Sequence, residues 1–82
     1  MEKHIGTVTH YYSHLSVAVL NLVDEIHLGD EIRIKGHITD LVMTVGSLEI
    51  EHGKIESAGP GMEVALKVDD NVREGDKLYK VM

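Results

Sequence analysis

Two short Gly-Asp segments, one in each half of the chain, constrain the fold more than any other feature of the sequence. They lie at residues 29–30 and 75–76, and each leads into a run of apolar and polar residues in alternation. Glycine adopts positive φ without steric cost, and aspartate can accept a hydrogen bond from its own backbone in a tight turn. Each Gly-Asp segment therefore predicts a turn that delivers the chain into a β-strand.

Period-two alternation of apolar and polar residues predicts the other strands. The clearest case is residues 62–69, where Met, Val, Leu and Val alternate with Glu, Ala, Lys and Asp. Residues 15–23 are almost continuously apolar and rich in Val, so we interpret them as a strand buried on both faces, with a helix as the alternative. The remaining strands are expected at residues 5–12, 32–35, 41–55 and 77–81.

Six strands with almost no helix predict an all-β fold. We expect a single domain over residues 1–82, because a chain of this length buries only about 60% of the surface that its unfolded form exposes. A small sheet loses its unpaired edges most readily by closure, so the expected architecture is a six-stranded antiparallel closed β-barrel. Its core must be aliphatic, because the sequence contains neither Trp nor Phe.

The charge and the cysteine count exclude several classes of function. Three basic residues stand against six acidic ones before Gly46, and five against eight after it, so each half carries a net charge of −3. We therefore expect no DNA binding and no general affinity for nucleic acid, although a local pocket for one nucleotide is compatible with this charge. The absence of Cys, of an export signal and of a long apolar run predicts a cytoplasmic protein with no membrane partner.

Six histidines raise the question of a metal site, but their spacing does not support one. His10 and His14 are four residues apart, which places two imidazoles on one face only in a helix. We therefore expect no metal and no cofactor, and interpret the histidines as solvated. Ser13 and Ser16 lie near these histidines without an oxyanion element or a nucleophile elbow, so we expect a chain that is not an enzyme.

Five short motifs follow one another along almost the whole chain. They are Ile5-Gly6-Thr7-Val8, Leu28-Gly29-Asp30-Glu31-Ile32, Val45-Gly46-Ser47-Leu48-Glu49-Ile50, Ala58-Gly59-Pro60-Gly61-Met62-Glu63-Val64 and Arg73-Glu74-Gly75-Asp76. Their order resembles the β-barrel second domain of the translation GTPases, the elongation and initiation factors, and the segment from Thr7 to Val19 resembles small stand-alone translation-factor-like proteins. The barrel appended to the carboxyl end of U32 peptidases is similar as well.

The resemblance to translation factors implies a non-catalytic module that binds a protein or ribonucleoprotein partner, such as tRNA or the ribosome. No P-loop segment occurs, so we expect no GTP binding by this chain. Glu49 matches the position that lines a pocket for a terminal adenosine in such factors, where a carboxylate can accept a ribose hydroxyl. The simpler interpretation is that Glu49 is the polar residue between two inward-facing apolar ones.

Tyr11 and Tyr12 are the other candidates for a binding role. In an extended strand they point to opposite faces, so only one of them can lie in the core. The other is either an exposed anchor for a protein partner or a stacked base, or is partly buried with its hydroxyl in water. The resemblance to the U32-appended barrel implies a different function, that of an accessory subunit or detached C-terminal domain of a U32-type peptidase-like enzyme.

Overall fold

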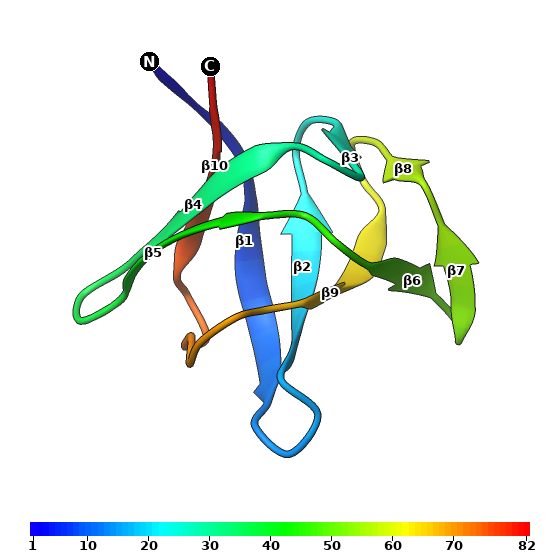
Figure 1. Ribbon diagram of the computed structural model, residues 1–82, viewed down its shortest axis with the longest axis horizontal. Helices are drawn as coiled ribbons and strands as arrows, with labels where there is room; N and C mark the ends of the chain where they lie inside the picture. Colours follow the sequence, from blue (N-terminus) through cyan, green and yellow to red (C-terminus); the bar gives the residue numbers. More distant parts are fainter.

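The computed structural model describes residues 1–82 and contains ten β-strands and no helix (Figure 1). The strands are β1 (Glu2–Tyr12), β2 (Val17–Leu22), β3 (Ile26–His27), β4 (Glu31–Lys35), β5 (Asp40–Thr44), β6 (Leu48–Ile50), β7 (Gly53–Ile55), β8 (Ser57–Ala58), β9 (Glu63–Lys67) and β10 (Lys77–Val81). The structure therefore contains no helix that could span a bilayer.

Eight of the strands form one curled sheet in the order β5-β4-β10-β1-β2-β9-β6-β7, and β3 pairs with β8 in a separate two-stranded sheet (Figure 1). Every pairing is antiparallel, which confirms the predicted all-β antiparallel fold. The predicted six-stranded closed barrel is not observed, because the end strands β5 and β7 do not pair and the sheet stays open.

The difference from six strands arises mainly in the segment expected to be one long strand over residues 41–55. The chain leaves the sheet at residues 45–47 and reverses direction at Glu51 and His52, so this segment forms three strands, β5, β6 and β7. The reversal turns β7 into the outermost strand. The hairpin therefore ends the sheet at the place where a continuous strand was expected to help close it.

A single hydrophobic core of 17 buried residues lies inside the curl of the sheet. None of these residues is aromatic, in agreement with the aliphatic core that the composition predicts. The alternation in β9 is confirmed, because Val64 and Leu66 are buried while Glu63 and Lys67 are exposed. In β2, Ala18 and the leucines face the core, whereas the outward valines are only half-buried.

The two Gly-Asp segments form the same turn, as the sequence predicts. Gly29 and Gly75 have φ values of 89° and 91°, in the left-handed region that favours glycine. Three residues before each aspartate, a backbone N–H donates to its carboxylate: His27 to Asp30 Oδ2 and Arg73 to Asp76 Oδ2, both at 2.8 Å. The aspartates therefore stabilise the turns from which β4 and β10 begin.

Each turn is also joined to a buried valine by two backbone hydrogen bonds, to Val45 directly after β5 in the first turn and to Val8 of β1 in the second. Gly29 N–H donates to the Val45 carbonyl at 2.8 Å, and Val45 N–H donates to the Asp30 carbonyl at 2.9 Å. The second turn makes the same pair of bonds to Val8, both at 2.8 Å. Since β4 pairs with β5, β10 with β1, and β4 with β10, the four strands β5-β4-β10-β1 have an approximately two-fold arrangement around the β4–β10 pair.

Replacing either turn glycine tests this arrangement. We expect Gly29→Ala and Gly75→Ala each to lower the free energy of unfolding by about 1 kcal/mol, because a Cβ is strained at positive φ. No neighbouring atom lies within 4 Å of the new Cβ at either position, so the loss is a backbone effect.

Gly46→Ala is the matched control, measured in the same urea unfolding experiments. Gly46 also has no atom within 4 Å of a built Cβ, but its φ is not positive, so this variant should be neutral or slightly stabilised. Equal stability of all three variants would contradict the role assigned to the turns.

Candidate functional site

A groove of about 730 Å³ lies on the outer face of the sheet over β2, β9 and β6, and we call it the β2–β9 groove. The outward side chains of Val17, Val19 and Ala65 line it at the centre. Tyr12 and Leu15 border it from the β1–β2 hairpin, and residues 49–52 border it from the β6–β7 hairpin. The groove is thus a sheet face bounded by two hairpin turns.

The strand register explains why these side chains lie together. Val19 on β2 is opposite Ala65 on β9, and Ala65 is opposite Glu49 on β6, so the three form one row across the sheet. Tyr12, Val17 and Lys67 form a second row on the same face. Residues that are directly opposite on neighbouring strands share a face and contact one another. The two rows therefore bring together side chains that are up to 55 positions apart in the sequence (67 − 12 = 55).

Tyr12 and Glu49, two of the three residues predicted to form a binding site, both line the β2–β9 groove. The Tyr12 side chain is 48% exposed, and its ring lies 4.5 Å from the His10 ring between centroids. Glu49 is half-buried at the β6 border of the groove. An exposed aromatic ring at one border of a groove and a carboxylate at the opposite border can supply both apolar contact and charge recognition.

Tyr11 lies elsewhere, which confirms that the two tyrosines face opposite sides. Its hydroxyl donates to Asn71 Oδ1 at 2.9 Å, and its ring packs against the core. It lines a second hollow of about 530 Å³ between the β4–β5 hairpin and residues 70–73. The predicted residues Tyr11, Tyr12 and Glu49 are therefore divided between two surfaces. The sequence prediction did not include Val17, Val19 and Ala65, although the apolar run at 15–23 was a signal for two of them.

The charged side chains of the β2–β9 groove are predominantly acidic. The lining carries three carboxylates, those of Glu49, Glu51 and Glu63, and one ammonium group, that of Lys67, while Lys54 lies opposite Glu49 on β7 at the margin of the groove. None of the four lining groups takes part in an ion pair within the chain. Their charges are consequently available to a bound molecule, and the excess of carboxylates favours a cationic one.

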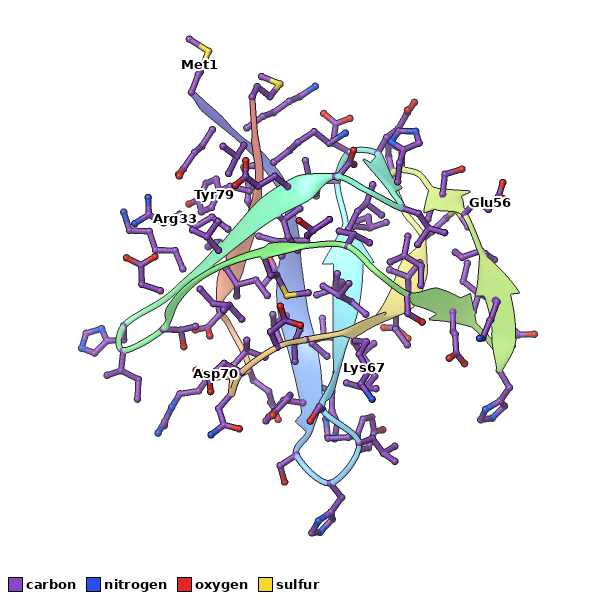
Figure 2. The ribbon with its side chains drawn as sticks, in the orientation of Figure 1. Met1, Arg33, Glu56, Lys67, Asp70 and Tyr79 are labelled. Atoms are coloured by element: carbon purple, nitrogen blue, oxygen red, sulfur yellow. The ribbon has the colours of Figure 1, made fainter.

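A different arrangement is found around β4 and β10, where charged side chains pair with one another. Arg33 donates through Nε and Nη2 to the two Asp40 oxygens, both at 2.7 Å, and through Nη1 to Glu2 at 3.0 Å. These hydrogen bonds lower the pKa of the Asp40 carboxyl and raise the pKa of Arg33. Figure 2 shows Arg33 beside Tyr79 and well separated from Lys67, so this ion-paired region is distinct from the groove.

Asp30 in the first Gly-Asp turn combines a structural hydrogen bond with an ion pair. Lys80 Nζ lies 3.2 Å from Asp30 Oδ2. Partial burial opposes ionisation of Asp30, but the His27 N–H and the Lys80 ammonium outweigh it and lower the pKa of this carboxyl. The structure brings no group of three or more His, Cys, Asp and Glu side chains into a metal-binding arrangement.

All non-glycine residues with positive φ lie in the two turns that border the β2–β9 groove. They are Ser16 at 55°, Glu51 at 49° and His52 at 68°. Glu51 and His52 are the two central residues of the hairpin closed by the Ile50–Gly53 pair, and a turn with both φ values positive favours Asn-Gly. The left-handed conformation costs about 1–2 kcal/mol for each such residue, so the two turns that border the groove lower the free energy of unfolding.

Relieving this strain should stabilise the chain. We expect His52→Gly to raise the free energy of unfolding by about 1 kcal/mol, because glycine adopts φ 68° without steric conflict. His37→Gly is the control, since His37 is also exposed in a hairpin turn but does not have positive φ. It should be destabilised by a few tenths of a kcal/mol or more, because glycine adds backbone freedom to the unfolded chain. Thermal or urea unfolding that shows the same change in both variants would refute the assignment of strain to His52.

Comparison with known proteins places this geometry beside peptidase-associated domains. No model of a known protein family matches the chain. The structure superposes on the C-terminal domain of a Geobacillus thermoleovorans protein described as a U32 peptidase, with a TM-score of 0.90 over 98% of this chain and 93% of that one, at 20% sequence identity. The fold is that of a U32 peptidase C-terminal domain.

Sequence comparison identifies relatives of the same kind. The chain is 40% identical over 76 residues to an uncharacterized protease of Methanocaldococcus jannaschii, which covers 92% of this chain and 19% of that protein. It is 34% identical over 81 residues to a collagenase of Porphyromonas gingivalis, which covers 96% of this chain and 22% of that protein. The chain thus spans about a fifth of the length of these relatives.

These relatives show that the interpretation as a translation-factor module is wrong, whereas the similarity to the U32-appended barrel is supported. The motifs that carried the translation-factor resemblance include Gly29, Gly61 and Gly75, all of which have positive φ. These glycines are required by the turns of a small β fold and do not identify a binding partner. The RNA-binding roles of Glu49, Tyr11 and Tyr12 stay predictions that these comparisons do not test.

Proposed function

We propose that the chain is a non-catalytic accessory module that acts together with a larger U32-type peptidase-like protein, as a detached counterpart of a C-terminal domain. One observation carries this proposal: the similarity includes more than nine-tenths of this chain but only about a fifth of each protease relative. In such a pair, the peptidase chemistry belongs to the part of the enzyme that this chain does not contain. The chain supplies a binding surface.

The β2–β9 groove supports a binding role. Its centre is formed by outward-facing aliphatic side chains of an antiparallel sheet, where polar residues are the norm. Its volume of about 730 Å³ is within the range of pockets that bind ligands or inserted side chains, roughly 300–1,000 Å³. A half-buried apolar face with unpaired carboxylates is better suited to recognition of another molecule than to contact with water alone.

A direct test is to mix the purified chain with U32-type peptidase-like proteins encoded in the same genome. We expect a one-to-one complex in analytical ultracentrifugation with those that lack a C-terminal domain of this fold, with a Kd of about 10 μM or tighter, as is usual for specific interfaces. Peptidase-like proteins that already carry such a domain are the control and should bind more weakly, because their own domain occupies the docking surface.

Absence of a complex with every such protein, at concentrations of about 100 μM, would refute the accessory role. Peptide hydrolysis by the purified chain alone would refute its non-catalytic character. Peptidase activity of the complex that differs from the activity of the enzyme alone would support the proposal further.

A further inference from the structure

We infer that the β2–β9 groove binds an extended cationic segment of a protein, one that places an aliphatic side chain against Val17, Val19 and Ala65. The identity of the protein that carries the segment rests on the proposed function, but the chemistry of recognition rests on the groove. Four features of the groove, its apolar centre, its free carboxylates, an interrupted strand ladder and its strained borders, support this inference independently.

The apolar centre accounts for the aliphatic part of the ligand. Val17, Val19 and Ala65 are each only half-buried, although Val19 and Ala65 lie within regular strands and Val17 begins β2. Tyr12 and Leu15 remain 48% and 61% exposed at the border. An aliphatic side chain inserted among these residues removes their remaining apolar surface from water, which stabilises the complex.

The free carboxylates account for the positive charge. Glu49, Glu51 and Glu63 form no ion pair within the chain, although Lys54 lies opposite Glu49, whereas Arg33 on β4 is already paired with Glu2 and Asp40. A lysine or arginine of the ligand can pair with these carboxylates at the border of the groove, where partial shielding from solvent strengthens the attraction. An acidic segment, by contrast, is repelled by them.

The interrupted ladder accounts for the extended conformation. On one side, β9 pairs with β2 over all of Glu63–Lys67, but on the other side only Ala65 and Leu66 pair with β6. The antiparallel register directs the backbone N–H and C=O of Glu63 toward β6, where no residue pairs with them. Lys67 N–H donates to the Ser47 carbonyl at 3.3 Å, so the open position is confined to Glu63. An extended peptide that crosses the border of the groove can form a main-chain hydrogen bond with this one residue.

The strained borders indicate that this shape is retained for a purpose. All positive-φ non-glycine residues of the chain lie in the two turns beside the groove. Strain of this kind persists where the surrounding structure holds it, and it is concentrated at binding sites. The Glu51-His52 turn directs the β6–β7 hairpin, and Ser16 lies between Leu15 and Val17 in the opposite border.

Binding of defined peptides tests the inference without the peptidase-like protein. The probe is a capped heptapeptide in which lysine and valine alternate at the odd positions with threonine between them, so that both side chains meet the groove from one face of the extended peptide. Its counterparts carry glutamate for lysine or serine for valine. By isothermal titration calorimetry, we expect the Lys/Val peptide to bind about tenfold or more tightly than either counterpart. Equal affinity of the Lys/Val and Glu/Val peptides would overturn the charge selection, and equal affinity of the Lys/Val and Lys/Ser peptides would overturn the apolar contact.

Substitutions locate the binding surface. Tyr12→Ala and Glu49→Gln should each weaken the Lys/Val peptide about fivefold to tenfold. Both side chains are outside the core, so the fold is retained. Ile38→Ser is the matched control: Ile38 is 68% exposed in the β4–β5 hairpin, outside the groove, and the variant should bind as the unchanged chain does. Loss of affinity in the control alone, or preferential binding of an RNA oligonucleotide by the groove, would overturn the inference.

The failure of this inference can be distinguished from the failure of the proposed function. If the chain binds a peptidase-like protein but Tyr12→Ala and Glu49→Gln leave that complex unchanged, the inference is wrong and the accessory role stands. If the Lys/Val peptide binds in the groove but no peptidase-like protein does, the inference stands and the accessory role is wrong.

Discussion

The two backbone hydrogen bonds that join each Gly-Asp turn to a buried valine are the constraint on which the rest of the structure depends. At Gly29 and Gly75 the chain reverses with positive φ, and the turn then binds Val45 or Val8 by two backbone hydrogen bonds. These bonds set where β4 and β10 begin and which neighbouring strand each one meets. Because side chains alternate along a strand, the starting point of a strand also decides which of its residues face the core.

The outer face of the sheet follows from the same register. With the core face of β2 and β9 taken by Ala18, Leu20 and Leu66, the outward positions fall to Val17, Val19 and Ala65. An apolar stripe is thus exposed beside carboxylates, while ion pairs of the sheet are formed around β4 and β10, by Arg33 with Glu2 and Asp40 and by Lys80 with Asp30. The segment that forms β2 is apolar on both faces of the strand, but only one face packs into the core. The other face forms the binding surface.

The sequence predicts the features that depend on local chemistry. The two Gly-Asp turns, the alternation in β9 and the opposite faces of Tyr11 and Tyr12 all follow from residue type and spacing. The β6–β7 hairpin could not be predicted, because Glu51 and His52 occupy a turn that normally carries Asn-Gly. The residue pattern at 41–55 does not mark this turn, so the segment was predicted as one strand. A continuous strand there led to the prediction of a closed barrel in place of the open sheet.

Function was harder to predict, because the recognisable motifs serve the backbone. Glycines at positive φ are required by turns of this shape in any protein that contains them, so their order identified a type of fold and pointed to the wrong family. Tyr12 and Glu49 were chosen as single residues, yet they acquire a shared surface only when β1, β2, β9 and β6 are in register. Long-range pairing of this kind is not visible in local spacing.

The most direct test of the account is to map the docking surface by NMR. Methyl groups of Val, Ile and Ala in the labelled chain are followed during titration with a U32-type peptidase-like protein that lacks this domain. Docking through the β2–β9 groove predicts chemical-shift changes at Val17, Val19 and Ala65 and unchanged signals at Ile38 and Val42, which lie outside the groove. Changes confined to Ile38 and Val42, or no change at any methyl group, would contradict docking through the β2–β9 groove.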